Sequence, residues 1–226
     1  MNMDAILDYL SLLAQNNNQA WFHANKAQYK AASREFEALI DELTLELRRT
    51  DDTIPLIASK ELTFKLQRDT RFSHDKSPYN PCFRTHISGK GKLPIPVGYY
   101  IMLHPGNRSF LGGGLFADMF QNATAMVRNY IVGYGEQWQE IISSPDFTAN
   151  FTVRGSALKN LPRGYDAAHP QAEFLKNKSW YLEYPLSDEQ LQSPAFIRFA
   201  ADIFTKMQPF NQYLNRALEG FEMPLR

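Results

Sequence analysis

The segment VGYYIMLHPGNRSFLGGGLF, residues 97–116, decides the fold. It contains two runs rich in aromatic and aliphatic side chains, residues 97–104 and 109–116, which favour β-strands. Pro105-Gly106-Asn107 lies between them, and these residue types favour tight turns. Two strands joined by so short a turn pair in antiparallel fashion. We therefore predict a β-hairpin here.

Strand-like patterns also occur on either side of this hairpin. Apolar and polar side chains alternate from Leu62, which predicts a strand over residues 62–69, and a further strand is expected at 83–88. Downstream, a strand is expected at 179–184. Sequential strands with short connections favour an antiparallel sheet, so we predict one from about residue 62 to 116, completed by the strand near 179–184.

Helical patterns lie before, between and after these strands. Apolar residues at intervals of three and four predict an N-terminal pair of helices and a C-terminal helix that Pro209 interrupts. No linker or repeat divides the chain. We therefore predict a single α+β domain over residues 1–226, with the sheet packed against N- and C-terminal helices. The helices are expected at 4–14, from 18 to about 50, from Asp118 with a capping box to Gln121, at 136–142, at 170–177, and from Ser193.

Composition excludes several classes of protein. Hydrophobic residues make up 44% and charged residues 21% of the chain, as in ordinary globular proteins. The formal net charge is zero, which argues against attraction to nucleic acid or to a membrane. No apolar run approaches the roughly 20 residues of a membrane span. The single cysteine, Cys82, and histidines without metal-ligand spacing predict no metal site. The single cysteine and a start without a signal-like apolar run predict a cytoplasmic location.

The most unusual segment is RDTRFSHDKSPY, residues 68–79, which we call the signature loop. Arg68 shares a predicted strand face with apolar residues, so its guanidinium requires a carboxylate or phosphate partner. In one interpretation the charges are structural, and the two arginines pair with the two aspartates of the loop. In the other, Arg71 and Lys76 keep free donors for an anionic ligand. The candidate ligand-binding residues of the loop are Arg68, Asp69, Arg71, Asp75, Lys76 and Tyr79.

Two further segments carry candidates. Gly113 and Gly114 belong to a triple glycine ahead of a predicted helix, where a backbone can approach an anion. The alternative is a bulged strand with another element packed against it. His169 lies three residues after Asp166, and such a pair could act as a base and its orienting group, or simply fasten a loop.

The chain resembles the domain-of-unknown-function family 2461, a group of conserved hypothetical proteins. The resemblance rests on Arg68-Asp69-Thr70-Arg71-Phe72, on Trp21-Phe22, and on further positions along nearly the whole chain. These include Arg128, which the resemblance adds to the candidate ligand-binding residues. One departure is Asn80-Pro81, where the family tends to have Lys-Thr. The resemblance supports the predicted fold and implies no particular reaction, substrate or cofactor.

Three functional hypotheses follow from the sequence. In the first, the signature loop binds a small phosphate- or carboxylate-bearing molecule, with or without chemical turnover. In the second, a basic sheet face docks an acidic partner without catalysis. In the third, the charges of the loop are purely structural. The sequence leaves open whether the protein is an enzyme, and it leaves open the oligomeric state.

Overall fold

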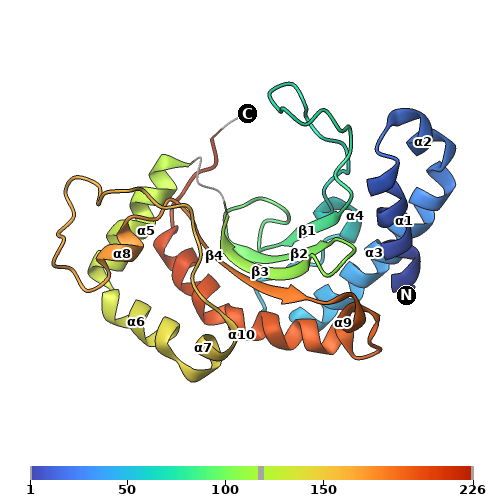
Figure 1. Cartoon of the computed structure of the whole chain (residues 1–226). Coiled ribbons are helices and arrows are strands. Elements are labelled where there is room, and N and C mark those ends of the chain that lie inside the picture. Colours follow the sequence, from blue (N-terminus) through green and yellow to red (C-terminus); the bar gives the residue numbers. More distant parts are fainter. Residues whose placement is uncertain (1, 117–119, 225–226) are drawn as a thin grey trace.

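The computed structural model describes residues 2–116 and 120–224. An antiparallel sheet forms its centre, with four strands in the order β1-β2-β3-β4 (Figure 1). The α+β class and the antiparallel sheet predicted from the sequence are confirmed. Pairing joins Ile101 to Thr85 on one side and to Leu111 on the other. The strands are β1 Phe83–Ile87, β2 Gly98–Leu103, β3 Ser109–Leu115 and β4 Trp180–Leu186.

Helices precede the sheet, fill the connection between β3 and β4, and follow β4. Asn2 and Asn18 each accept a backbone N–H of the helix that they begin, which explains where α1 and α2 start. No helix in the described ranges is long and apolar enough to cross a membrane. The helices are α1 Met3–Gln15, α2 Gln19–Ala24, α3 Lys26–Leu47, α4 Ser59–Leu62, α5 Gln121–Gly133, α6 Gly135–Ser143, α7 Pro145–Asn150, α8 Ala172–Leu175, α9 Asp188–Gln192 and α10 Phe196–Ala217.

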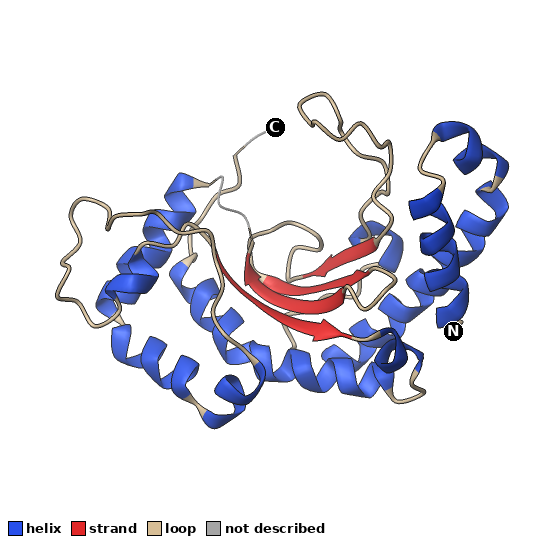
Figure 2. Cartoon of the chain, viewed as in Figure 1, coloured by secondary structure: helices blue, strands red, loops and turns tan. Residues whose placement is uncertain are grey.

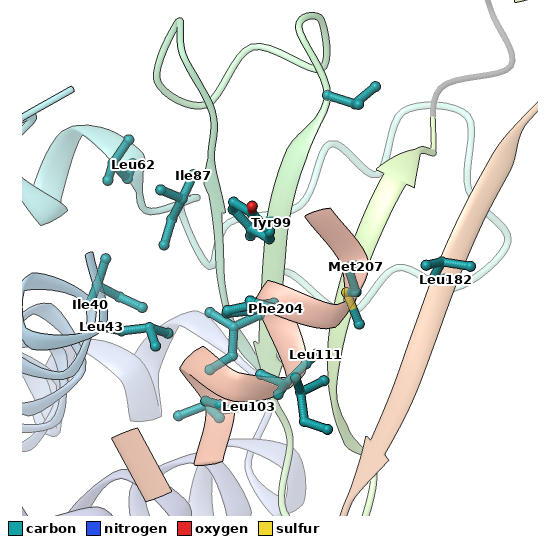
Figure 3. Packing of buried hydrophobic residues seen from close by; sticks show 14 of the residues in the cluster. Ile40, Leu43, Leu62, Ile87, Tyr99, Leu103, Leu111, Leu182, Phe204 and Met207 are labelled. Carbon is teal, nitrogen blue, oxygen red and sulfur yellow. The ribbon is translucent and has the colours of Figure 1, made fainter. Parts of the chain in front are cut away.

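The main core lies under one face of the curved sheet. Helix α10 runs beneath the convex face and contacts β3, while α3 contacts both α10 and β1. Leu103 and Leu111 point from the strands toward Phe204 of α10, and all three are fully buried (Figure 3). Burial of such side chains contributes roughly 1.5–3 kcal/mol each. The N- and C-terminal helices therefore share one core with the sheet, as predicted.

The triple glycine lets α10 approach the sheet. An added Cβ at Gly113 would lie 3.0 Å from the Met207 sulfur and 3.0 Å from Asn211 Oδ1, both on α10. At Gly114, φ is +93°, a backbone conformation that side chains disfavour. These glycines belong to a strand with a helix packed against it, which is the structural alternative that the sequence had left open.

Three local predictions were wrong. Residues 62–69 form no regular strand: α4 ends at Leu62, and only isolated bridges such as Gln67↔Tyr79 follow. A break at Asn25 divides the expected second helix into α2 and α3. Pro209 does not interrupt the last helix, because α10 continues through it. The predicted capping box at Asp118 lies outside the described residues.

Candidate functional site

The signature loop is held at its base. The Arg68 amide donates to the Pro78 carbonyl at 2.9 Å, and the Asn80 amide donates to the Leu66 carbonyl at 2.8 Å. The side chain of Asn17 clamps the Tyr79 backbone by donating to its carbonyl and accepting from its amide. The buried Tyr79 ring stacks on Phe22, with centroids 4.2 Å apart. Tyr79 therefore anchors the loop to the N-terminal helices.

The arginines of the signature loop are paired within the loop. Arg68 forms an ion pair with Asp75 and also donates to the Ser77 carbonyl. Arg71 pairs with Asp69, with 2.6 Å between Nη2 and Oδ2. Hydrogen bonds from Ser77, with a smaller contribution from Arg68, lower the pKa of Asp75 to about 2. The ion pairs of the structural interpretation are therefore present.

Lys76 differs from the two arginines. Its ammonium group donates to the Thr70 carbonyl at 2.9 Å and forms no ion pair with any residue of the two described ranges. An ammonium group carries three donors. Lys76 is thus the cation of the loop that retains capacity for an external anion.

The remaining candidates lie elsewhere. Arg128 on α5 donates to the Asn177 carbonyl at 2.7 Å, and burial lowers its pKa. His169 accepts the Gln171 amide on Nδ1, while the Asp166 carboxylate accepts the Ala168 amide. Both α5 and the loop that leads into α8 lie on the far side of the sheet from the signature loop (Figure 1). The predicted residues therefore do not form one cluster.

A second surface was not predicted from the sequence. The long helices α3 and α10 lie beneath the sheet, and the opposite, concave face is bordered by loops (Figure 2). Half-buried aromatic rings occupy that face. We call them the ring floor, and they are Phe64, Tyr100, Phe110, Phe116 and Tyr181.

The rings of the floor are in contact with one another. The Tyr100 ring stacks on Phe110 at 5.7 Å between centroids and lies 5.3 Å from Phe116. Phe116 in turn stacks on Tyr181 at 4.5 Å, and Phe64 lies 6.4 Å from Tyr100. Aromatic pairs at these separations are favourable in offset-stacked or tilted geometries. The result is a continuous aromatic surface from the base of the signature loop to β4.

Gly112 makes this arrangement possible. It pairs with Tyr100 of β2 and Glu183 of β4, at the centre of the concave face. A Cβ at this position would lie 2.9 Å from the end of the Phe116 ring. Because glycine has no side chain, Phe116 can lie across β3 and connect Tyr100 to Tyr181.

One end of the ring floor carries a cation. The Arg84 guanidinium lies over the Phe64 ring at 5.6 Å from its centroid, a cation–π contact. Burial raises the pKa of Tyr100, and the neighbouring Arg84 opposes that shift. Arg84 is half-buried and forms no ion pair with a carboxylate of the described residues. Its guanidinium also donates a hydrogen bond to the Tyr100 side chain. A half-buried guanidinium without a carboxylate partner is suited to hold an anion.

Two other titratable groups lie near Arg84: His86 in β1 and Cys82, which immediately precedes β1. His86, the strand partner of Tyr100, is 6% exposed, and burial lowers its pKa to about 4. Its ring is therefore neutral near pH 7. Burial raises the pKa of the Cys82 thiol, although Arg84 opposes this shift. Cys82 is thus a protonated thiol near pH 7 and a poor nucleophile.

The other end of the ring floor carries an ion pair. Arg154 Nη1 lies 3.0 Å from Glu183 Oε2. The backbone of Arg154 forms an antiparallel bridge with Tyr181. Both side chains are partly exposed to solvent. This end can therefore offer an acceptor as well as a donor to a ligand lying on the rings.

The sequence contained a signal for the concave face. Arg84, Tyr100 and Phe110 occupy strand positions that alternate with the fully buried Phe83, Ile101 and Leu111. That alternation identifies one face as core, but it does not show whether a helix covers the other. The strand register and the position of Phe116 above Gly112 were needed to bring the rings together.

The model of a conserved hypothetical protein family, DUF2461, matches residues 5–213. The chain belongs to this family. The DUF2461 match includes both the signature loop and the ring floor, so the resemblance seen in the sequence is confirmed. No curated protein and no solved structure matches the chain.

Proposed function

We propose that this DUF2461 protein binds a small anionic molecule, one that bears a phosphate or carboxylate group, on the concave face of its sheet beside the signature loop. The observation that carries the proposal is the half-buried ring floor, on the sheet face opposite α3 and α10, with Arg84 at one end. The anion contacts the Arg84 guanidinium, and a flat or apolar body lies on Tyr100 and Phe116.

The ring floor supports this because its rings are contiguous and only half-buried, which leaves part of their surface accessible to a ligand. Contiguous aromatic patches on a protein surface mark binding sites more often than isolated rings do. A flat ligand ring stacking on one of these side chains would gain roughly 1–3 kcal/mol, the range known for bases on aromatic platforms.

Arg84 supports an anionic ligand for an electrostatic reason. A half-buried guanidinium is partly dehydrated, so an oxyanion replaces lost water with charge-assisted hydrogen bonds. Lys76 of the signature loop is a second available cation, whereas Arg68 and Arg71 are already paired. We therefore assign the principal anion contact to Arg84 and a secondary contact to Lys76.

A thermal-shift screen tests the proposal. The wild-type protein is melted with inorganic phosphate, nucleotides, sugar phosphates and aromatic carboxylates. A ligand at 100 times its dissociation constant should stabilise the fold by about 2.7 kcal/mol. We expect compounds that combine a ring with an anionic group to shift the melting temperature most.

Variants distinguish binding at the ring floor from binding at the signature loop. Arg84→Gln and Tyr100→Leu should each weaken binding of a hit by about tenfold or more. Arg198→Gln, on α10 beneath the sheet, is the matched control and should change nothing. If Arg71→Ala or Lys76→Ala abolishes binding while Arg84→Gln leaves it intact, the ligand lies on the signature loop instead. If no anion in the panel shifts the melting temperature, the proposal fails.

Phe72 favours a second candidate function. It is 95% exposed at the tip of the signature loop, and the Arg71 guanidinium lies 5.9 Å from its ring centroid. An exposed aromatic residue beside cations is typical of an anchor for an acidic partner protein. This candidate predicts that Phe72→Ser abolishes a salt-sensitive protein interaction and leaves small-molecule binding unchanged. Cross-linking of the wild type and the variant in a lysate at low and high salt measures the protein interaction, and the thermal-shift screen measures small-molecule binding.

A further inference from the structure

A separate cavity of about 540 Å³ lies at the end of the sheet, and we call it the end pocket. Its walls come from the loop after α3, the connection from β1 to β2, and the last turns of α10. No residue of the ring floor lines it. Its volume is in the range of small-molecule sites. The residues on which the argument depends are Asp51, Lys90, Tyr99, Asn215 and Arg216.

The walls of the end pocket are held in place by hydrogen bonds. The Asn215 side chain accepts the Val97 amide at 2.8 Å and donates to the Val97 carbonyl at 3.0 Å. Asn211 donates to the Gly98 carbonyl at 3.0 Å. These contacts fix the end of α10 against the start of β2, so the cavity is formed before any ligand arrives.

A buried carboxylate lies in one wall. Asp51 is 8% exposed, and its Oδ2 accepts the Tyr99 hydroxyl at 2.7 Å. Its Oδ1 accepts the amide and the hydroxyl of Thr53. All three donors are neutral, and no cation among residues 2–116 and 120–224 forms an ion pair with this carboxylate. A buried carboxylate is stabilised when a positive charge approaches it.

Two cations lie in the other walls. Lys90 in the β1–β2 connection and Arg216 at the end of α10 are exposed, and neither forms an ion pair with a carboxylate in the described part of the chain. The lining also includes apolar side chains, among them Ile95 and Leu218, which are nearly fully buried. The pocket thus has a buried carboxylate, a short apolar wall and two exposed cations, together with one exposed carboxylate, Glu219, at its rim.

We propose that the end pocket binds a small zwitterion, a free amino acid or a molecule of the same chemistry. The ammonium group of the ligand contacts the Asp51 carboxylate, and its carboxylate contacts Arg216 and Lys90. The apolar wall receives the side chain. This proposal is independent of ligand binding at the concave face, because the two surfaces share no residue.

Titration calorimetry with the twenty L-amino acids at pH 7 tests the inference. We expect at least one to bind at millimolar concentration or below. For that amino acid, the matching amine without the carboxylate and the matching acid without the ammonium group should each bind about tenfold more weakly.

Variants assign the contacts. Arg216→Gln and Lys90→Gln should weaken binding of the amino acid and leave binding of the matching amine unchanged. Asp51→Asn, which keeps an acceptor for the Tyr99 hydroxyl, should weaken binding of both compounds. Lys92→Gln is the control, since Lys92 is exposed in the same connection but does not line the pocket. If Asp51→Asn does not fold, the Arg216 and Lys90 variants still show whether the ligand carboxylate binds in the end pocket.

Two outcomes overturn the proposal. The first is that none of the twenty amino acids binds at millimolar concentration. The second is that an amino acid binds, but Arg216→Gln and Lys90→Gln bind it as the wild type does.

Discussion

At the scale of single residues, Gly112 and Gly114 of β3 have different roles. An added Cβ at Gly114 would lie 2.5 Å from the backbone carbonyl oxygen of Trp180, and its φ of +93° disfavours a side chain. At Gly112 the closest atom is instead the end of the Phe116 ring, which can rotate away. The backbone conformation and the close carbonyl require glycine at position 114, whereas the position of the Phe116 ring requires glycine at position 112.

We therefore predict different effects of alanine at these two positions. Gly114→Ala should lower the free energy of unfolding by about 2–4 kcal/mol, because neither the clash nor the backbone conformation can relax. Gly112→Ala should cost only about 1 kcal/mol, since the Leu182 carbonyl is also close, but it should displace Phe116. Urea unfolding measures the stabilities, and NMR shifts of the Phe116 ring report its displacement. Equal stability losses would contradict the distinction.

His86 makes the stability depend on pH. Its pKa is about 4 in the folded protein and near 6.5 in an unfolded chain, so the unfolded state binds more protons between these values. The full contribution is present above pH 6.5 and is lost as the pH falls toward 4. We predict a loss of roughly 3 kcal/mol at most from this group over that window.

Substitution separates His86 from other groups that titrate in acid. His86→Gln should flatten the fall in melting temperature between pH 6.5 and 4. His23→Gln, at an exposed position on α2, should leave the fall unchanged. A His86→Gln protein with the pH dependence of the wild type would show that other groups cause the loss.

At the scale of structural elements, the signature loop is a braced loop rather than part of a strand. The Arg68 side chain is 21% exposed and holds Asp75 and the Ser77 carbonyl, whereas Arg71 is 77% exposed and pairs only with Asp69 two residues away. Contacts that cross the loop restrain it, and local pairs on the surface contribute little. The two arginines should therefore differ in their effect on the loop.

Hydrogen exchange measures that difference. We predict that Arg68→Ala speeds exchange over residues 68–80, including the Asn80 amide that donates to Leu66. Arg71→Ala should leave these rates close to those of the wild type. A larger effect from Arg71→Ala would mean that the surface pair with Asp69 restrains the loop.

The sequence predicted the elements better than it predicted the site. The aromatic and aliphatic runs on either side of a short turn identified β2 and β3 within residues 97–116. Alternation misled at residues 62–69, where it predicted a strand and the chain forms only isolated bridges. The dense charges of the signature loop suggested a ligand-binding site. In the structure Arg71 pairs with Asp69, two residues away, and Arg68 pairs with Asp75, seven residues away. The ring floor depends on register between distant strands, which local patterns do not contain.

At the scale of the whole molecule, α10 joins the parts of the chain. It contacts α3, β3, α5 and α6, so elements from both ends of the sequence depend on the same helix. We predict a single cooperative unfolding transition in urea, with tryptophan fluorescence and circular dichroism giving the same midpoint. Leu111→Ala, at the fully buried contact between β3 and α10, should lower the free energy of unfolding by roughly 2–5 kcal/mol.

The outcome that would contradict this view is two separated transitions. If Leu111→Ala shifted only one of them, the sheet and part of the helical structure would unfold as separate units, and the prediction of a single domain would fail.

The position of α10 after all four strands also has a consequence for synthesis. A ribosome makes β1, β2, β3 and β4 before it makes the helix that covers their apolar face. During that interval the nascent sheet presents Leu103, Leu111 and Leu182 to water or to whatever else can shield them. Partly folded chains of this kind are prone to aggregate. Chaperone capture during translation should therefore be strongest after β4 emerges and should end when residues 196–217 become available to fold.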